Sequence, residues 1–179
     1  VADDIKTSAI WSILFALIAI ALYILIRFRN IAFSAGAVVG LVHDVLFILG
    51  IYSIFYSIMP FSLEIDQSFI AAILTVIGYS INDTVVVFDR IRENVGLYPK
   101  RALNELINMS VNSTLSRTFS TSFSTALPLL AMFIFGGETI RGFVFAILLG
   151  VIVGTYSTIF IASPIAYDIQ QKQAKKLNK

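Results

Sequence analysis

The chain has 179 residues, of which 58% are hydrophobic and 13% charged, with a formal net charge of +2 at pH 7 and a mean hydropathy of +0.87. Because soluble domains carry about 25% charged residues, this composition excludes the soluble class and indicates an integral membrane protein. The chain has no cysteine, which excludes disulfides and thiolate metal sites.

Five charge-poor segments follow in chain order, at about 8–26, 33–59, 68–88, 117–136 and 141–167. Each reaches about the 20 residues that a helix needs to cross ~30 Å of hydrocarbon. The segments are continuous apolar runs, whereas the strands of a transmembrane barrel alternate strictly. The sequence therefore predicts a single all-α transmembrane domain over 1–179, a polytopic bundle with five membrane helices.

The loops between these segments carry unequal charge. Arg27 and Arg29 follow the first span, four basic residues follow the third and four lysines lie in the tail, whereas the other side has only Lys6 and Arg141. The positive-inside rule then predicts an outside N-terminus and a cytoplasmic C-terminus. No basic patch is interleaved with base-stacking aromatics, so we expect no nucleic-acid partner, and the basic tail is suited to anionic membrane lipid.

The N-terminal residues VADDIK show no basic segment ahead of a short apolar core, so they do not resemble a signal peptide. Since Val1 is not a methionine, we expect that the chain has been shortened there. Farther along, a segment at about 99–114 has apolar and polar residues on opposite faces, and Pro99 suits the first turn of a helix. This pattern predicts an amphipathic cytoplasmic helix at the interface, or an extension of the fourth span.

Ionisable residues inside the spans are the candidate functional residues. Each costs ~2.5–3.5 kcal/mol near a helix centre, so it needs a partner, a watery cavity or a function. In the third span, Asp83 has Tyr79 and Ser80 on its face and Asn82 beside it. We interpret Asp83 and Asn82 as part of a proton relay, with Tyr79 and Ser80 as secondary polar sites. A satisfied polar contact between helices is the alternative.

The fourth span begins at Arg117, and its hydroxyl face continues through Ser120, Thr121 and Ser124 toward Pro128. If the third and fourth helices are adjacent, Arg117 can reach toward the relay carboxyl, and protonation of that carboxyl would release the arginine. The alternative is that Arg117 extends to the cytoplasmic interface. We place Arg117 and Thr121 in the relay and treat Ser120 and Ser124 as secondary polar sites.

The second span contains His43 and Asp44 in its middle. Adjacent positions on a helix diverge by about 100°, so the two side chains are not expected to face one partner directly. One histidine without a second ligand at i+4 argues against a metal site, and no cofactor is expected. A relay role and a packing role both remain open for this pair.

Two small-xxx-small patterns predict close helix packing, within this bundle or against another membrane subunit. These patterns are Gly36 with Gly40, and Gly150 with Gly154.

Several stretches together resemble a known family. GLVHD at 40–44, GYSINDTVVVFDRIREN at 78–94, SRTFSTS at 116–122 and FGG at 135–137, followed by GF at 142–143, occur in the order and spacing of the SecF membrane region. SecF belongs to the SecD/SecF protein-export family, which is related to the resistance-nodulation-division superfamily. The resemblance covers essentially the whole chain and corresponds to spans two to six, without the first span and the outer domain.

This resemblance implies a multi-pass protein of the bacterial cytoplasmic (inner) membrane. It would work with SecD, or with the SecD half of a fused SecDF, and use the proton motive force to assist late movement of a preprotein through the SecYEG channel. YajC is a further implied partner. The resemblance matches Asp83 to the acidic residue of the family's ND pair and Arg117 to the basic residue of the next span, and it implies no covalent catalysis.

The residues also leave two other functions open. Asp44 and Asp83 on neighbouring spans could share a proton, as in an intramembrane aspartyl hydrolase. Alternatively, the chain could be a purely structural scaffold held together through its glycine faces.

Overall fold

The structure is a computed structural model that describes residues 2–177. This range contains helices and no strand. The helices are α1 (Ala2–Phe28), α2 (Ile31–Phe55), α3 (Gln67–Leu97), α4 (Leu103–Phe135), α5 (Glu138–Ser157), the π-helical segment η1 (Thr158–Ala162) and α6 (Ser163–Leu177).

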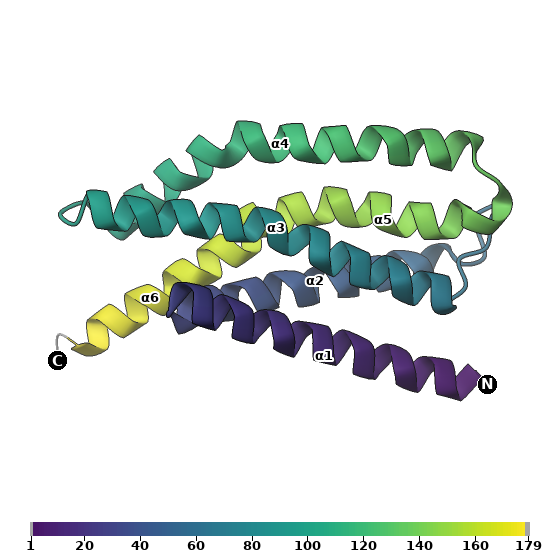
Figure 1. Cartoon of the computed structure of the whole chain (residues 1–179), viewed down its shortest axis with the longest axis horizontal. Coiled ribbons are helices and arrows are strands. Elements are labelled where there is room, and N and C mark those ends of the chain that lie inside the picture. Colours follow the sequence, from purple (N-terminus) through teal and green to yellow (C-terminus); the bar gives the residue numbers. More distant parts are fainter. Residues whose placement is uncertain (1, 178–179) are drawn as a thin grey trace.

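Five helical segments are long and apolar enough to cross a membrane, and the last of them joins α5, η1 and α6 from Glu138 to Lys176. The prediction of an all-helical bundle with five spans is confirmed. Figure 1 shows the chain ends at opposite ends of the bundle, with the α3–α4 connection at the same end as the C-terminus, as an odd number of crossings requires. The side of the membrane on which each end lies stays a prediction, as does the treatment of 1–179 as one domain.

Polar side chains mark the starts of two helices. The Asn30 side chain accepts a hydrogen bond of 2.9 Å from the amide of Ala32 at the start of α2. The Asp66 carboxylate does the same at 2.8 Å for the amide of Phe69 in α3. Both side chains satisfy amides that the first helical turn leaves without a partner.

Several helix limits differ from the sequence prediction. The amphipathic segment does not begin at Pro99, because 98–102 lie outside the helices and α4 begins at Leu103. From Leu103 the helix is continuous to Phe135, so this segment extends the fourth span. The second helix ends at Phe55 and not near 59, while the third continues past 88 to Leu97.

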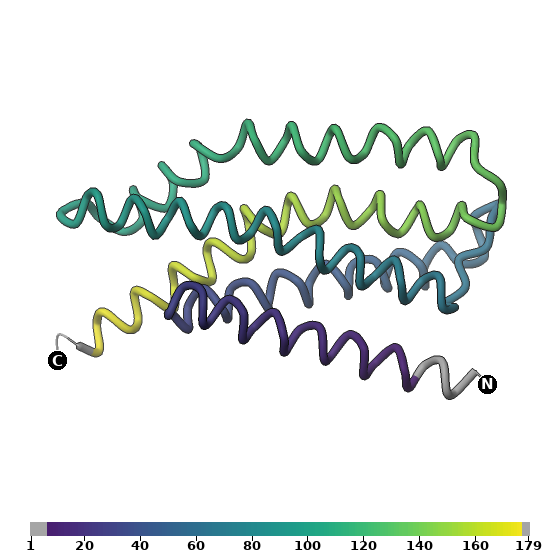
Figure 2. Tube along the Cα trace, viewed as in Figure 1, coloured from purple at the N-terminus to yellow at the C-terminus, as the bar shows by residue number. Residues whose placement is uncertain are grey.

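Helix α3 lies at the centre of the bundle, in contact with α1, α2, α4 and α5, and Figure 2 follows the trace of these helices. One apolar core packs Ile73 and Val76 of α3 against α2 and α5. A second core, nearer the C-terminal end of α3, includes Phe28, Phe33 and Phe88, whose rings lie with centroids 4.8 to 6.2 Å apart. The polar residues of α3 are therefore held inside the bundle by packing on several sides.

The last crossing contains a wide turn. At the end of η1, the backbone amide of Ser163 donates to the carbonyl of Thr158, five residues earlier, and the Ser163 hydroxyl donates to the same oxygen at 2.8 Å. Such π-helical turns are rare and occur frequently at functional sites. This one lies where α5 ends and α6 begins.

Candidate functional site

Asp83 is an unpaired carboxyl inside the bundle. Its side chain is only 2% exposed, and neither carboxylate oxygen has a hydrogen-bond partner among the described residues. A buried polar group without a partner costs about 1–3 kcal/mol, and more if it is charged. Buried side-chain polar groups of native proteins are usually satisfied, so an unpaired one calls for an explanation.

Arg117 does not neutralise this carboxyl by direct contact. Its charge acts on Asp83 electrostatically, but no ion pair joins the two within residues 2–177. Arg117 is exposed on α4, whereas the next residue, Thr118, is 1% exposed and its hydroxyl is also unpaired. The structure therefore places the cation on the outer face of α4 and leaves two unpaired buried polar groups, one on α3 and one on α4.

The other predicted relay residues are not gathered around Asp83 by hydrogen bonds. Asn82 is exposed on α3, and Thr121 is half-buried with its hydroxyl donating to the carbonyls of Arg117 and Thr118 at 3.1 and 3.0 Å. Ser120 is exposed and donates to the carbonyl of Ser116 in its own helix at 2.8 Å, and Ser124 is exposed as well. The relay roles of these residues stay a prediction.

Asp44 contrasts with Asp83, because it is fully buried and both of its carboxylate oxygens have hydrogen-bond partners. Its Oδ2 accepts hydrogen bonds from the hydroxyls of Ser80 at 2.7 Å and Ser157 at 2.9 Å. Its Oδ1 lies 3.2 Å from Nδ1 of His43. One carboxyl thus joins α2, α3 and α5.

His43 turns away from the interior, as the angle between adjacent helix positions predicts, yet its ring nitrogen still reaches back to Asp44. The ring is about one-third exposed and lies beside Phe47 and Tyr156, with centroids 6.1 and 6.3 Å away. Among the described residues, no group of three His, Asp or Glu side chains is placed to bind a metal ion.

Hydroxyl pairs connect the helices around the two carboxyls. Ser122 and Thr155 pair at 2.6 Å between α4 and α5, and Thr84 pairs with Thr158 at 2.9 Å between α3 and η1. The Tyr79 hydroxyl donates to Ser122 at 3.5 Å. Sequence reasoning missed Ser122, Thr155, Ser157 and Thr158, and their only signal is a hydroxyl within an apolar run.

Both glycine patterns lie at contacts within this chain. A Cβ on Gly36 would lie 2.5 Å from the carbonyl oxygen of Ala162, and one on Gly40 would lie 3.3 Å from the Ala162 methyl. A Cβ on Gly150 would overlap the Val76 side chain, and one on Gly154 would lie 3.0 Å from Ser80. The first pattern thus brings α2 against η1, and the second brings α5 against α3.

The geometry does not form an aspartyl hydrolase pair. Such a pair needs two carboxyls close enough to share a proton. Asp44 is bonded to Ser80, Ser157 and His43, and no hydrogen bond joins it to Asp83 in the described part of the chain.

Two replacements of Asp44 are expected to show how much its hydrogen bonds contribute to the stability of the bundle. The Asp44→Leu variant removes both bonds to Oδ2 and leaves the buried Ser80 hydroxyl without an acceptor, whereas the Ser157 hydroxyl keeps its bond to the Gly154 carbonyl at 3.2 Å. An unpaired buried hydroxyl costs about 1–3 kcal/mol, so the melting temperature should fall. Asp44→Asn keeps one acceptor and should lose less. Thermal unfolding of the purified full-length complex in detergent measures both.

The control adds Ser80→Ala and Ser157→Ala to the leucine variant. Removing the two hydroxyls as well should recover part of the lost stability, because the buried Ser80 donor is then no longer left unpaired. An Asp44→Leu protein as stable as the parent would show that these hydrogen bonds do not stabilise the bundle.

Comparisons with known proteins agree with the resemblance seen in the motifs. The protein translocase subunit SecF of Rhodothermus marinus is 54% identical over 175 residues, which cover 98% of this chain and 56% of that protein. SecF of Rhodobacter capsulatus is 48% identical over 169 residues, covering 94% of this chain and 49% of that protein. The chain therefore spans about half the length of these curated relatives.

The fold also matches a solved structure. A crystal structure of SecDF in a super-membrane-facing form superposes with a TM-score of 0.85 at 38% sequence identity, over 100% of this chain and 24% of that chain. Residues 1–172 match the family of protein export membrane proteins SecD/SecF, in its C-terminal region. The chain belongs to the SecD/SecF protein-export membrane protein family.

Proposed function

We propose that this chain is the membrane region of a SecF-type subunit that couples proton flow to late protein translocation through the Sec channel. In this function Asp83 takes up and releases a proton within the membrane, and Arg117 responds to the change in charge. The chain would act in the bacterial inner membrane and carry out no covalent chemistry. The names of its relatives support the setting, and the state of Asp83 supports the chemistry.

The contrast between the two buried carboxyls carries the proposal. Asp44 accepts two hydroxyl hydrogen bonds and contacts a histidine, as a structural carboxyl should. Asp83 is similarly buried but has no hydrogen bond on either oxygen. A carboxyl that is not committed to its own bundle is free to exchange a proton or to accept a bond from another subunit.

The outer faces of α3 and α4 support a partner in the membrane. Asn82, Arg117, Ser120 and Ser124 are exposed there, and polar and charged groups are costly against lipid. We infer that SecD, or the SecD half of a fused protein, covers this surface and contributes the carboxylate with which Asp83 and Arg117 work. The Sec channel SecYEG, YajC and the moving preprotein are the further partners in this proposal.

The energy of one proton is sufficient for such a switch. A charge that crosses ~100 mV releases about 2.3 kcal/mol, which is comparable with the few kcal/mol that separate two conformations of a protein. Repeated protonation of Asp83 can therefore shift the bundle between two arrangements of α3 and α4. The parts of the protein outside this chain would pass that motion to the preprotein.

Collapse of the proton gradient tests the proposed function directly. Membrane vesicles containing the Sec channel and the full-length complex should release a stalled translocation intermediate faster when a gradient is present. An uncoupler should remove this acceleration. Vesicles with the channel alone are the control, and their uncoupler-sensitive release should be much smaller. Equal sensitivity in the two preparations would contradict the proposal.

A further inference from the structure

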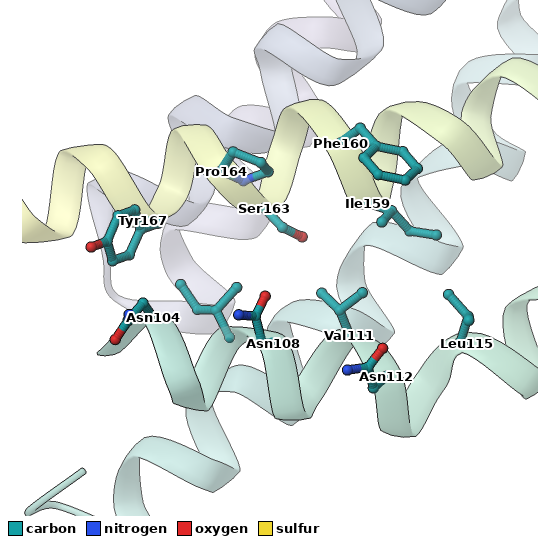
Figure 3. A pocket seen from close by; sticks show the side chains of 11 residues that line it. Asn104, Asn108, Val111, Asn112, Leu115, Ile159, Phe160, Ser163, Pro164 and Tyr167 are labelled. Atoms are coloured by element: carbon teal, nitrogen blue, oxygen red, sulfur yellow. The ribbon is translucent and has the colours of Figure 1, made fainter. Parts of the chain in front are cut away.

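A groove of about 490 Å³ lies between the N-terminal half of α4 and the η1–α6 segment. Figure 3 shows its two walls facing each other, with Asn104, Asn108 and Asn112 along α4 and Phe160, Pro164 and Tyr167 opposite. The volume falls in the ~300–1,000 Å³ range of sites that bury small organic molecules. None of the residues assigned to proton transfer lines it.

The α4 wall carries an apolar stripe beside a row of amides. Ile107, Val111 and Leu115 form the stripe, and the three asparagines recur at the same spacing of four residues. Eight residues of helix rise about 12 Å, so both rows follow the groove for that length. The asparagine side chains make no hydrogen bond within the described part of the chain, which leaves their donors and acceptors available to a ligand.

The opposite wall is mainly apolar. Phe160, in a membrane-crossing segment, is 62% exposed, and Pro164 is exposed as well. The two polar groups of this wall are already bonded, because the Ser163 hydroxyl donates to Thr158 and the Tyr167 hydroxyl accepts from Gln171 at 2.8 Å. A ligand with a long apolar part and a polar end fits these two walls.

The charge around one end of the groove identifies the polar end of that ligand. Lys100 and Arg101 precede Asn104 on one side, and Lys172, Lys175 and Lys176 follow Tyr167 on the other, all exposed. Two acidic residues, Glu105 and Asp168, lie in the same stretches, and no acidic residue lines the groove. The surplus of positive charge lies at the bundle end that holds the α3–α4 connection and the C-terminus (Figure 1).

We propose that the groove binds one phospholipid with an anionic headgroup. The acyl chain lies along Ile107, Val111 and Phe160, the asparagine amides contact the glycerol and ester region, and the basic residues attract the phosphate and headgroup. The site lies in the amphipathic extension of α4, where an interfacial lipid is expected. Lipid binding needs no proton transfer, so this inference can fail or hold independently of the proposed function.

Native mass spectrometry of the full-length complex, washed in detergent and supplied with defined lipids, tests the inference. The complex should retain phosphatidylglycerol over phosphatidylcholine at equal supply. The Asn104→Leu/Asn108→Leu variant, which removes two amides at similar side-chain size, should lose this retained lipid. Gln173→Leu is the matched control, because Gln173 is an exposed amide on α6 that does not line the groove. The control should retain lipid as the parent does.

Two further arms decide the chemistry. Lys172→Gln should reduce the preference for phosphatidylglycerol about fivefold, the factor that corresponds to ~1 kcal/mol per basic residue at an anionic surface. Millimolar glycerol phosphate should not displace the lipid. Displacement would mean a site for soluble phosphate, and equal retention of both lipids would mean no charge selection. Equal retention in the double variant and the control, as when a protein segment covers the groove, would also overturn the inference.

Discussion

Replacing Asp83 with asparagine is expected to abolish the gradient-driven part of translocation and to leave the complex assembled. Asparagine has nearly the same shape but cannot take up a proton. Since neither carboxylate oxygen is bonded, the substitution breaks no hydrogen bond within the described chain. A proton crossing ~100 mV supplies about 2.3 kcal/mol, a factor of roughly 50 in an equilibrium constant, so we expect the loss to exceed about tenfold.

Asp89→Asn is the matched control, because Asp89 is a second aspartate on the same helix, six residues after Asp83. Asp89 is half-exposed and bonded to Arg27 and Arg92 at 3.1 Å each. Surface ion pairs of this kind contribute little, so Asp89→Asn should keep release rates within about twofold of the parent. Both rates can be measured in the vesicle assay with and without the uncoupler. Normal gradient-driven release by Asp83→Asn would remove the carboxyl from the mechanism.

Replacing Gly36 with alanine is expected to lower the thermal stability of the complex. The added methyl would lie 2.5 Å from the carbonyl oxygen of Ala162 and 3.3 Å from the Ala166 methyl. The first neighbour is backbone, so α2 and η1 must move apart. Overpacking of this kind costs about 1–3 kcal/mol, and the melting temperature in detergent should fall accordingly.

Gly50→Ala provides the comparison on the same helix. A Cβ at Gly50 would meet no atom within 4 Å. That variant should melt at or slightly above the parent temperature, since alanine is the better helix former. If the two alanine variants had equal stability, the close approach of α2 to η1 would not limit the stability of the bundle.

The spans could be predicted because hydrophobicity along the chain is a local property. Five long apolar runs need five crossings whatever their arrangement. Helix limits were harder to predict. Pro99 taken alone suits a helix start, but it lies in the turn that joins α3 to α4. Pro99 does lie just before a helix, but that helix begins four residues later, at Leu103.

The candidate site was predictable only in part. A carboxyl in an apolar helix is visible in the sequence, so Asp44 and Asp83 could both be singled out. Their opposite environments could not, because they depend on how the helices are rotated against one another. Ser157 lies 113 residues from Asp44 in the sequence, and no local pattern predicts their hydrogen bond. For the same reason, sequence alone could not decide between an inward and an outward Arg117.

The π-helical turn in η1 also shifts the phase of the last crossing. A π turn contains one residue more than an α turn, so every later residue is rotated by about 100° relative to an uninterrupted helix. Ser157 and Ala162 are five residues apart and would point about 140° apart on an uninterrupted α-helix, yet both face Gly40 of α2, where an added Cβ would lie 4.0 Å from the Ser157 hydroxyl oxygen and 3.3 Å from the Ala162 methyl. A helical wheel drawn through the whole crossing separates these two residues, whereas the π turn brings them to one face. The number of residues in η1 therefore determines which side of α6 meets α2 and which lines the groove.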